Sequence, residues 1–220
     1  MAQPELIIFD CDGVLVDSEP LANAVLADYL TELGYPVTAT DCMERFVGLS
    51  LESVRDRIEN GSSLILPDDF INEIKRRDHV AFAGRLKPIT NILDAIKKIP
   101  QLKCVASSGS PDKIDNSLTT TGLIDFFQPH IYSAAEVKNG KPAPDLFLHA
   151  AREMNSDPGK TIVIEDSLAG VEAGVRAGMT VLGFCGGGHI PPGHAGKLVD
   201  IGATQAFEDM AILPDMIDAL

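Results

Sequence analysis

Short apolar runs alternate with longer segments of helical period over most of the chain. The runs lie at residues 6–9, 103–106, 161–164 and 180–184, with a weaker one at 131–132. Continuous apolar stretches of this length are typical of strands buried on both faces of a parallel sheet. Between the runs, helical periodicity covers residues 89–98, 111–120, 144–154 and 168–177. This alternation predicts an α/β fold with a doubly wound parallel sheet.

The segment between the first apolar run and residue 86 breaks the alternation. It holds helix-period stretches at 20–33, 40–46, 51–60 and 68–83, which glycines separate. We therefore predict two domains in this 220-residue chain. Residues 1–17 and 86–220 form the α/β core, and residues 18–85 form an inserted α-helical domain.

The amino-acid composition of the chain argues against some classes of binding partner. The net charge of −14 argues against a non-specific binder of nucleic acid or anionic membranes, although a local site can still accept a small anion. No apolar stretch approaches the roughly 20 residues that span a bilayer. The N-terminus lacks the pattern of a signal peptide, and the four cysteines form no CxxC pair. These features predict a cytoplasmic protein, which we expect to be a monomer or weak homodimer.

The end of the first apolar run carries the strongest chemical signal. Asp10 and Asp12 follow it directly, and Gly13 comes next. In a strand, residues i and i+2 point the same way, so both carboxylates should leave the strand together. Buried neighbouring carboxylates are costly unless a cation neutralises them. The pair predicts a metal site, a nucleophile, or both.

The later strand ends add complementary groups. Ser107 and Ser108 stand directly before a helix, where hydroxyls and free amides favour an anion. Lys141 follows the weaker third run, and Glu165 with Asp166 follows the fourth. Carboxylates, water and a substrate phosphate are the ligands that Mg²⁺ prefers, while lysine and amides suit the other phosphate oxygens. The predicted sheet edge therefore suits Mg²⁺ together with a phosphorylated small molecule.

One cysteine and two histidines have interpretations that give them no chemical role. Cys11 lies between the two acidic residues, but a catalytic cysteine needs a nearby histidine and none is local, so we expect a bystander thiol. His189 and His194 are surrounded by glycines and prolines, which predicts exposed loop residues and no metal site.

Taken in order, the polar strand ends resemble the four motifs of the haloacid dehalogenase superfamily. The matching stretches are residues 10–18, Ser107, Lys141 and residues 165–170. The resemblance covers the whole chain and is nearest to members with a helical cap after the first strand. These include β-phosphoglucomutase and sugar-phosphate phosphatases, among them enzymes that act on 6-phosphogluconate. It implies a Rossmann-like core and a Mg²⁺-dependent phosphatase of a small phosphorylated metabolite.

The resemblance also implies roles at the metal site. Asp10 is the nucleophile and a Mg²⁺ ligand. Asp12 is the general acid and base, and its backbone carbonyl binds the metal. Asp166 completes the metal site, with Glu165 assisting directly or through water.

The remaining implied roles concern the substrate. Ser107 and the Ser108 amide hold the transferring phosphoryl group, and Lys141 neutralises the nucleophile and the phosphate. Arg45 is a candidate specificity residue in the helical insert, although most helix arginines are simply solvated.

Alternatives from other classes remain. A β-phosphoglucomutase-like enzyme would carry a histidine near Ala22 and an arginine where the chain has Leu49-Ser50-Leu51, so both departures favour hydrolysis. The dehalogenases lack the second aspartate, so Asp12 argues against that chemistry. A phospho-receiver-like signalling domain shares the acidic site and lysine, but would not explain the helical insert.

Overall fold

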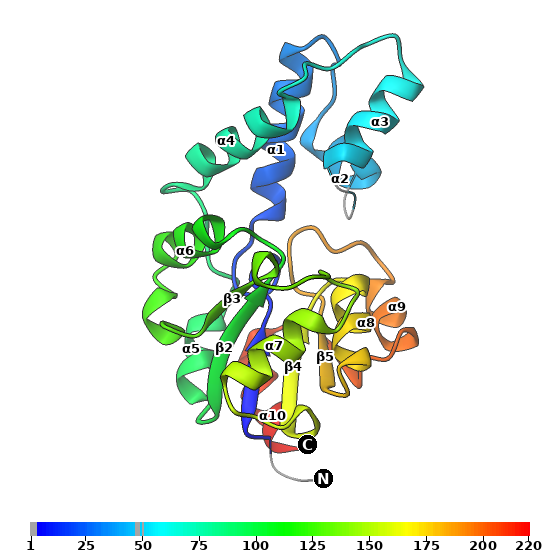
Figure 1. Ribbon diagram of the computed structural model, residues 1–220. Coiled ribbons are helices and arrows are strands. Elements are labelled where there is room, and N and C mark those ends of the chain that lie inside the picture. The colour runs from blue at the N-terminus through cyan, green and yellow to red at the C-terminus, as the bar shows by residue number, and fades with distance from the viewer. Residues whose placement is uncertain (1–3, 47–48, 50) are drawn as a thin grey trace. The chain divides into compact units, whose positions relative to one another are not determined.

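The computed structural model describes residues 4–46, 49 and 51–220. The comparison with mutases at Gly48 and Ser50 lies outside these residues and rests on the sequence alone. The chain divides into two compact units, one formed by Met1–Asp17 with Lys87–Leu220 and the other by Ser18–Leu86. Figure 1 shows an α/β arrangement for the first unit and helices alone for the second.

Among the described residues of the first unit, six parallel strands form one sheet, in the order β3-β2-β1-β4-β5-β6. The predicted doubly wound α/β fold is confirmed. The bounds of the strands are β1 Leu6–Phe9, β2 Leu102–Ser107, β3 Ile131–Ser133, β4 Thr161–Glu165, β5 Thr180–Phe184 and β6 Gln205–Phe207. The sequence pattern missed β6, because this edge strand has three residues and only two of them are apolar.

Helices connect the strands of the first unit. Their bounds are α5 Ile92–Lys98, α6 Pro111–Thr120, α7 Asp145–Glu153, α8 Leu168–Arg176, α9 His194–Asp200 and α10 Leu213–Asp218. Short 3-10 turns are η1 Ile124–Phe126, η2 Ala134–Glu136, η3 Pro158–Lys160 and η4 Met210–Ile212. The sequence pattern missed α9 and α10, which have seven and six residues and are too short for a periodic signal.

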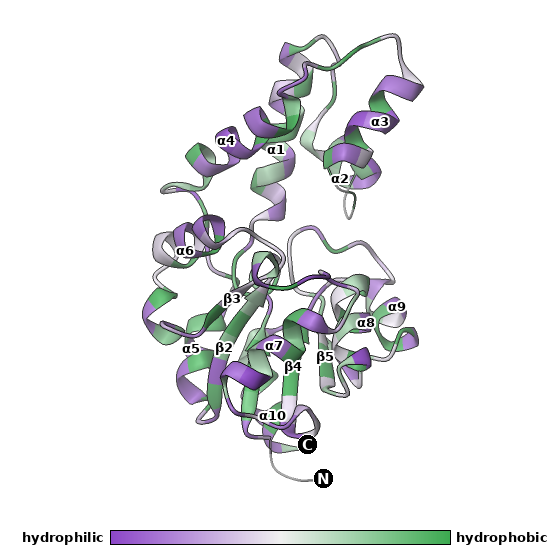
Figure 2. Ribbon diagram, in the orientation of Figure 1, coloured by the Kyte–Doolittle hydropathy of each residue, from purple (hydrophilic) through white to green (hydrophobic). Residues whose placement is uncertain are grey.

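The core of the first unit forms where helices cover the sheet. Leu6 and Ile8 of β1 are fully buried and share one apolar cluster with Phe147 of α7, Val171 of α8 and Leu198 of α9. Helices α5 and α10 contact each other on the other side of the sheet (Figure 1). Figure 2 shows the strands mainly in the hydrophobic colour and the helices with mixed faces. Burial on both faces explains why the strands read as continuous apolar runs.

The second unit is a set of helices around its own core. Its elements are α1 Glu19–Glu32, α2 Ala39–Phe46, α3 Leu51–Gly61 and α4 Phe70–Phe82. Tyr29 stacks on Phe70 with ring centroids 5.7 Å apart, and fully buried Leu30 lies in the same cluster. In neither unit do the described residues form a helix long and apolar enough to cross a membrane.

Candidate active site

The sheet register brings the predicted residues to one edge. Phe9 at the end of β1 pairs with Val105 of β2 and with Ile164 of β4. Asp10 therefore lies level with the ends of both neighbouring strands, where Ser107 and Glu165 stand. In open α/β sheets, this carboxyl edge is where ligands bind.

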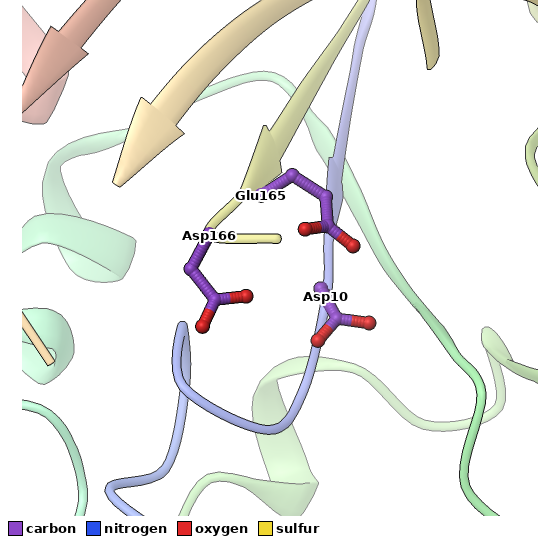
Figure 3. A group of neighbouring side chains, drawn as sticks. All are labelled: Asp10, Glu165 and Asp166. Atoms are coloured by element: carbon purple, nitrogen blue, oxygen red, sulfur yellow. The ribbon is translucent and has the colours of Figure 1, made fainter. Parts of the chain in front are cut away.

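Three carboxylates converge at this edge. One oxygen from each of Asp10, Glu165 and Asp166 lies within 4.8 Å of the others, and all three residues are buried. Figure 3 shows the three side chains pointing toward a common space between the ends of β1 and β4. Oxygen donors at this density are the donor set that a divalent cation takes.

Lys141 binds two of these carboxylates. Its Nζ donates to Asp10 Oδ1 at 2.5 Å, to Glu165 Oε1 at 2.8 Å and to the Ala106 carbonyl at 3.2 Å. The side chain is 5% exposed, and its ammonium lies 4.8 Å from the ring centroid of Phe147. Burial acts to lower the pKa of Lys141, but Asp10 and Glu165 outweigh it and hold the pKa above the usual range. The lysine is therefore a fixed positive charge beside Asp10.

The carboxylates outnumber the cation that Lys141 supplies. Burial raises the pKa of Asp10 to about 8, although Lys141 acts to lower it and Glu165 adds to the rise. Burial likewise raises the pKa of Asp166 to about 6. Three carboxylates and one ammonium leave two negative charges when all are ionised, and a divalent cation would cancel them. The donor set and the charge both fit a metal ion.

Glu165 uses its two oxygens differently. Oε1 accepts from Lys141, while Oε2 accepts from the Ser167 backbone N–H at 2.7 Å and from its hydroxyl at 2.9 Å. A methyl group on Gly170 would overlap Glu165, so only glycine fits there without movement. The carboxylate is thus held firmly in the orientation that fixes Lys141.

Asp12 departs from the expectation based on strand alternation. The strand ends at Phe9, and Gly13 follows Asp12 with a φ of 79°, so the period of two does not extend to Asp12. Its Oδ2 accepts from Nζ of Lys113 at 2.7 Å, and it is not a member of the three-carboxylate group found among the described residues. The two aspartates therefore pair with different lysines.

Lys113 was missed by the sequence reasoning. It lies near the start of α6, immediately after the Ser107 segment, and its side chain is 41% exposed. The available signal was a basic residue in the first turn of the helix that follows the Ser107 strand end.

The Ser107 segment is a braced turn at the start of α6. Ser107 is 1% exposed, and its Oγ accepts from the Gly109 N–H at 3.2 Å. Ser133, at the end of β3, donates its hydroxyl to the Gly109 carbonyl at 2.6 Å. Ser108 is exposed. A buried hydroxyl beside an accessible backbone segment at a helix start suits an anion.

His189 lies in a loop as expected and His194 does not, and neither histidine is exposed as expected. His189 Nε2 lies 2.9 Å from Asp166 Oδ2, with 9% of its side chain exposed. His194 begins α9, and its Nε2 lies 2.6 Å from the Asp166 carbonyl. Composition predicted the loop correctly, but not that the loop folds back onto the end of β4.

Arg45 belongs to the helical unit. It is exposed at the end of α2, and its guanidinium donates to the Tyr35 hydroxyl at 2.5 Å and lies over the Tyr35 and Phe46 rings. These contacts hold the side chain within its own unit while leaving its surface accessible.

Cys11 has the environment of an unreactive thiol. It is 1% exposed, and burial, followed by Asp12 and Asp10, raises its pKa well above the usual value. Because the thiolate is the nucleophilic form, these surroundings disfavour catalysis by Cys11.

Known proteins are similar to the chain over most of its length. Residues 7–184 match the family described as haloacid dehalogenase-like hydrolase. A 6-phosphogluconate phosphatase from Escherichia coli (strain K12) is 29% identical over 193 residues, 87% of each chain. A conserved haloacid dehalogenase-like protein of unknown function from Agrobacterium tumefaciens has a TM-score of 0.90 and 37% identity, covering 98% of each chain. A haloacid dehalogenase family hydrolase from Deinococcus radiodurans, solved with bound phosphate and sodium, has a TM-score of 0.85 and 29% identity, covering 100% of this chain and 97% of that one.

Proposed function

The chain belongs to the haloacid dehalogenase-like hydrolase family, and we propose that it is a Mg²⁺-dependent phosphatase of a small phosphorylated metabolite. One observation carries the proposal: Lys141 bridges Asp10 and Glu165 within a buried group of three carboxylates. A buried lysine beside a strand-end aspartate leaves that aspartate poised for nucleophilic attack on phosphorus.

Asp10 and Asp166 are the proposed side-chain ligands of Mg²⁺, with Glu165 assisting and the Asp12 carbonyl contributing. When bound, the ion would neutralise phosphate oxygens and the charge of the surrounding carboxylates. Lys141 is the protein's own cation beside Asp10. Ser107 and the Ser108 amide are the proposed donors to the remaining phosphoryl oxygens.

The first proposed step is transfer of the phosphoryl group to the protein. An Asp10 carboxylate oxygen attacks phosphorus, and the bond between phosphorus and the substrate oxygen breaks. Asp12 gives its proton to the departing alkoxide, which leaves as an alcohol. Lys141 and the Ser107 segment stabilise the negative charge of the transferring group.

The second proposed step is hydrolysis of the aspartyl-phosphate. Asp12, now ionised, takes a proton from water as the water oxygen attacks phosphorus. The bond between phosphorus and Asp10 breaks, which regenerates the carboxylate and releases inorganic phosphate. Asp12 thus ends the cycle protonated, as it began, with a proton from water in place of the one that left with the alcohol.

For the substrate, we propose a sugar phosphate, with 6-phosphogluconate as the first candidate. The 6-phosphogluconate phosphatase of Escherichia coli supports this choice. We further propose that the helical unit, residues 18–86, is a cap that excludes bulk water, and that exposed Arg45 contributes to substrate binding. Because the fold alone does not determine the substrate, the substrate has to be identified by a measurement of its own.

The test is phosphate release from a panel of sugar phosphates, 6-phosphogluconate, phosphoglycolate and nucleotides, with and without Mg²⁺. We expect Mg²⁺-dependent release from one or two sugar phosphates. Asp10→Asn should abolish release, because an amide cannot attack phosphorus, while retaining the folded circular dichroism spectrum and cooperative melting of the wild type.

Two results would contradict the proposal. Full activity of Asp10→Asn would exclude the aspartyl-phosphate route. Failure of the wild type to release phosphate from any compound would move the question to interconversion of sugar monophosphates in the presence of a sugar bisphosphate, the reaction of a mutase.

A further inference from the structure

The loop between β5 and α9 folds back onto the carboxyl edge of the sheet. Within it, His189 Nε2 lies 2.9 Å from Asp166 Oδ2, and the two side chains are 9% and 8% exposed. A carboxylate is an acceptor, so the imidazole nitrogen donates in this contact. The contact joins residues that are 23 positions apart in the sequence.

A second histidine holds the same residue by its backbone. His194 Nε2 lies 2.6 Å from the Asp166 carbonyl oxygen, so this nitrogen also donates. His194 is the first residue of α9, which anchors it to a helix. Asp166 is therefore restrained at its side chain and at its main chain by one connecting segment.

Glycines create the space for the His189 ring. A methyl group on Gly13 would overlap Asp166 Oδ2 and lie 2.9 Å from His189 Cε1, and one on Gly187 would lie 2.8 Å from the same carbon. The Gly188 N–H donates to Asp17 Oδ1 at 3.2 Å, which ties the loop to the segment after β1. The backbone on two sides thus encloses the imidazole.

We propose that His189 is a positioning residue of the metal centre and sets metal affinity by orienting Asp166. This inference rests on the proposed function, because it requires Asp166 to bind a metal ion. Among the described residues, the group with oxygens within 4.8 Å consists of Asp10, Glu165 and Asp166, and His189 is outside it. His189 therefore acts through Asp166: it binds Oδ2 and lets the carboxylate present Oδ1 to the ion.

A hydrogen bond to a metal-binding carboxylate fixes its rotamer before the ion arrives. Loss of such a supporting contact typically weakens metal binding about 10- to 100-fold. Because Asp166 follows β4 directly, its Cα is already fixed by the sheet, and the side-chain torsions are what His189 restrains.

The experiment measures metal binding directly. Calorimetric titration with Mg²⁺, and Mn²⁺ binding followed by electron paramagnetic resonance, are compared for the wild type and His189→Ala without substrate. We expect a Kd about 10- to 100-fold higher for His189→Ala. Metal-free melting temperatures are recorded in parallel, so that loss of affinity is separated from loss of folding.

Two further variants sharpen the comparison. His189→Gln should recover much of the affinity, because its amide nitrogen can donate from nearly the position of Nε2. His130→Ala, at an exposed histidine before β3, is the matched control and should bind metal like the wild type. If His189→Ala does not fold, the glutamine variant and its affinity relative to the wild type decide the question.

Each outcome has one meaning. A wild-type Kd in His189→Ala would overturn the inference while leaving the phosphatase proposal intact. Tighter binding would also overturn it, because His189 would then be competing with the ion for Asp166. If the wild type itself bound neither Mg²⁺ nor Mn²⁺, both this inference and the proposed metal-dependent function would fail.

Discussion

Asp10 and Asp12 contact different lysines. Lys141 is buried and contacts Asp10, whereas Lys113 is partly exposed and contacts Asp12. A buried cation next to the proposed nucleophile keeps that carboxylate beside a constant positive charge. A partly exposed one can release Asp12 when Asp12 turns to a leaving group. The different burial of the two lysines thus matches the different tasks proposed for the two aspartates.

The Lys113 contact predicts a dependence on the leaving group. Lys113→Met should lower kcat/KM roughly tenfold or more for a sugar phosphate, because Asp12 loses the contact that holds it and general acid catalysis contributes about 10²–10⁴-fold. The loss should be much smaller with 4-nitrophenyl phosphate, whose leaving group needs no proton. Steady-state kinetics with both substrates checks this.

Lys97→Met, at an exposed lysine of α5, is the matched control for Lys113→Met. Equal losses of kcat/KM with both substrates would show that Lys113 acts on binding of the phosphate rather than on Asp12.

At the scale of the secondary-structure elements, the residues that begin α8 contact Glu165. Ser167 precedes the helix, accepts from the Gly170 N–H at 3.0 Å and donates to Glu165. The same few residues therefore end a strand, cap a helix and orient the Glu165 carboxylate. Such close packing leaves no space for a side chain at Gly170.

Because of this packing, replacing Gly170 with alanine should lower the stability of the protein, although alanine favours helices more than glycine does. Gly170→Ala should destabilise the protein by about 1–3 kcal/mol through overpacking, and should lower activity because Glu165 and Lys141 must shift. Gly196→Ala in α9, where a methyl group meets nothing, should be neutral or stabilising by about 0.4–1 kcal/mol. Urea unfolding and phosphate release test both variants; equal stabilities would contradict the prediction.

For the whole molecule, the carboxylates at one sheet edge link stability to pH. Burial raises the pKa of Asp10 to about 8 and that of Asp166 to about 6, from 3.8 in the unfolded chain. Between pH 4 and 8 the metal-free folded state therefore binds more protons than the unfolded state. The contribution of these two carboxyl groups to the free energy of unfolding should fall as pH rises through this range and change no further above about pH 8.

The free energy of unfolding can change by about 1.4 kcal/mol per pH unit for each proton that only the folded state holds. Urea titrations in a chelator at several pH values should show a smaller fall in Asp10→Asn, which has no carboxyl to titrate there. Saturating Mg²⁺ should reverse the fall, because the ion binds the deprotonated carboxylates. Equal slopes in the wild type and in Asp10→Asn would contradict the assignment of this proton to Asp10.

Much of the fold was predictable because it depends on local pattern. The four stronger apolar runs became β1, β2, β4 and β5, since strands buried on both faces are mainly apolar. Strand β6 and the short helices α9 and α10 escaped prediction, because a few residues at the edge of the unit carry no periodic signal. They pack on other elements of the unit: β6 on β5, α9 on β5 and β6, and α10 on α5.

The sequence by itself determined the sheet edge at which Asp10, Ser107, Lys141 and Glu165 meet, because parallel strands bring their carboxyl ends together. Tertiary structure alone decided which side chain binds which. The pairing of Asp12 with Lys113, and of Asp166 with His189, depends on where a helix and a glycine-rich loop fold back onto that edge. The composition of such a segment predicts a loop, but burial and hydrogen bonding determine which part of the protein the loop contacts.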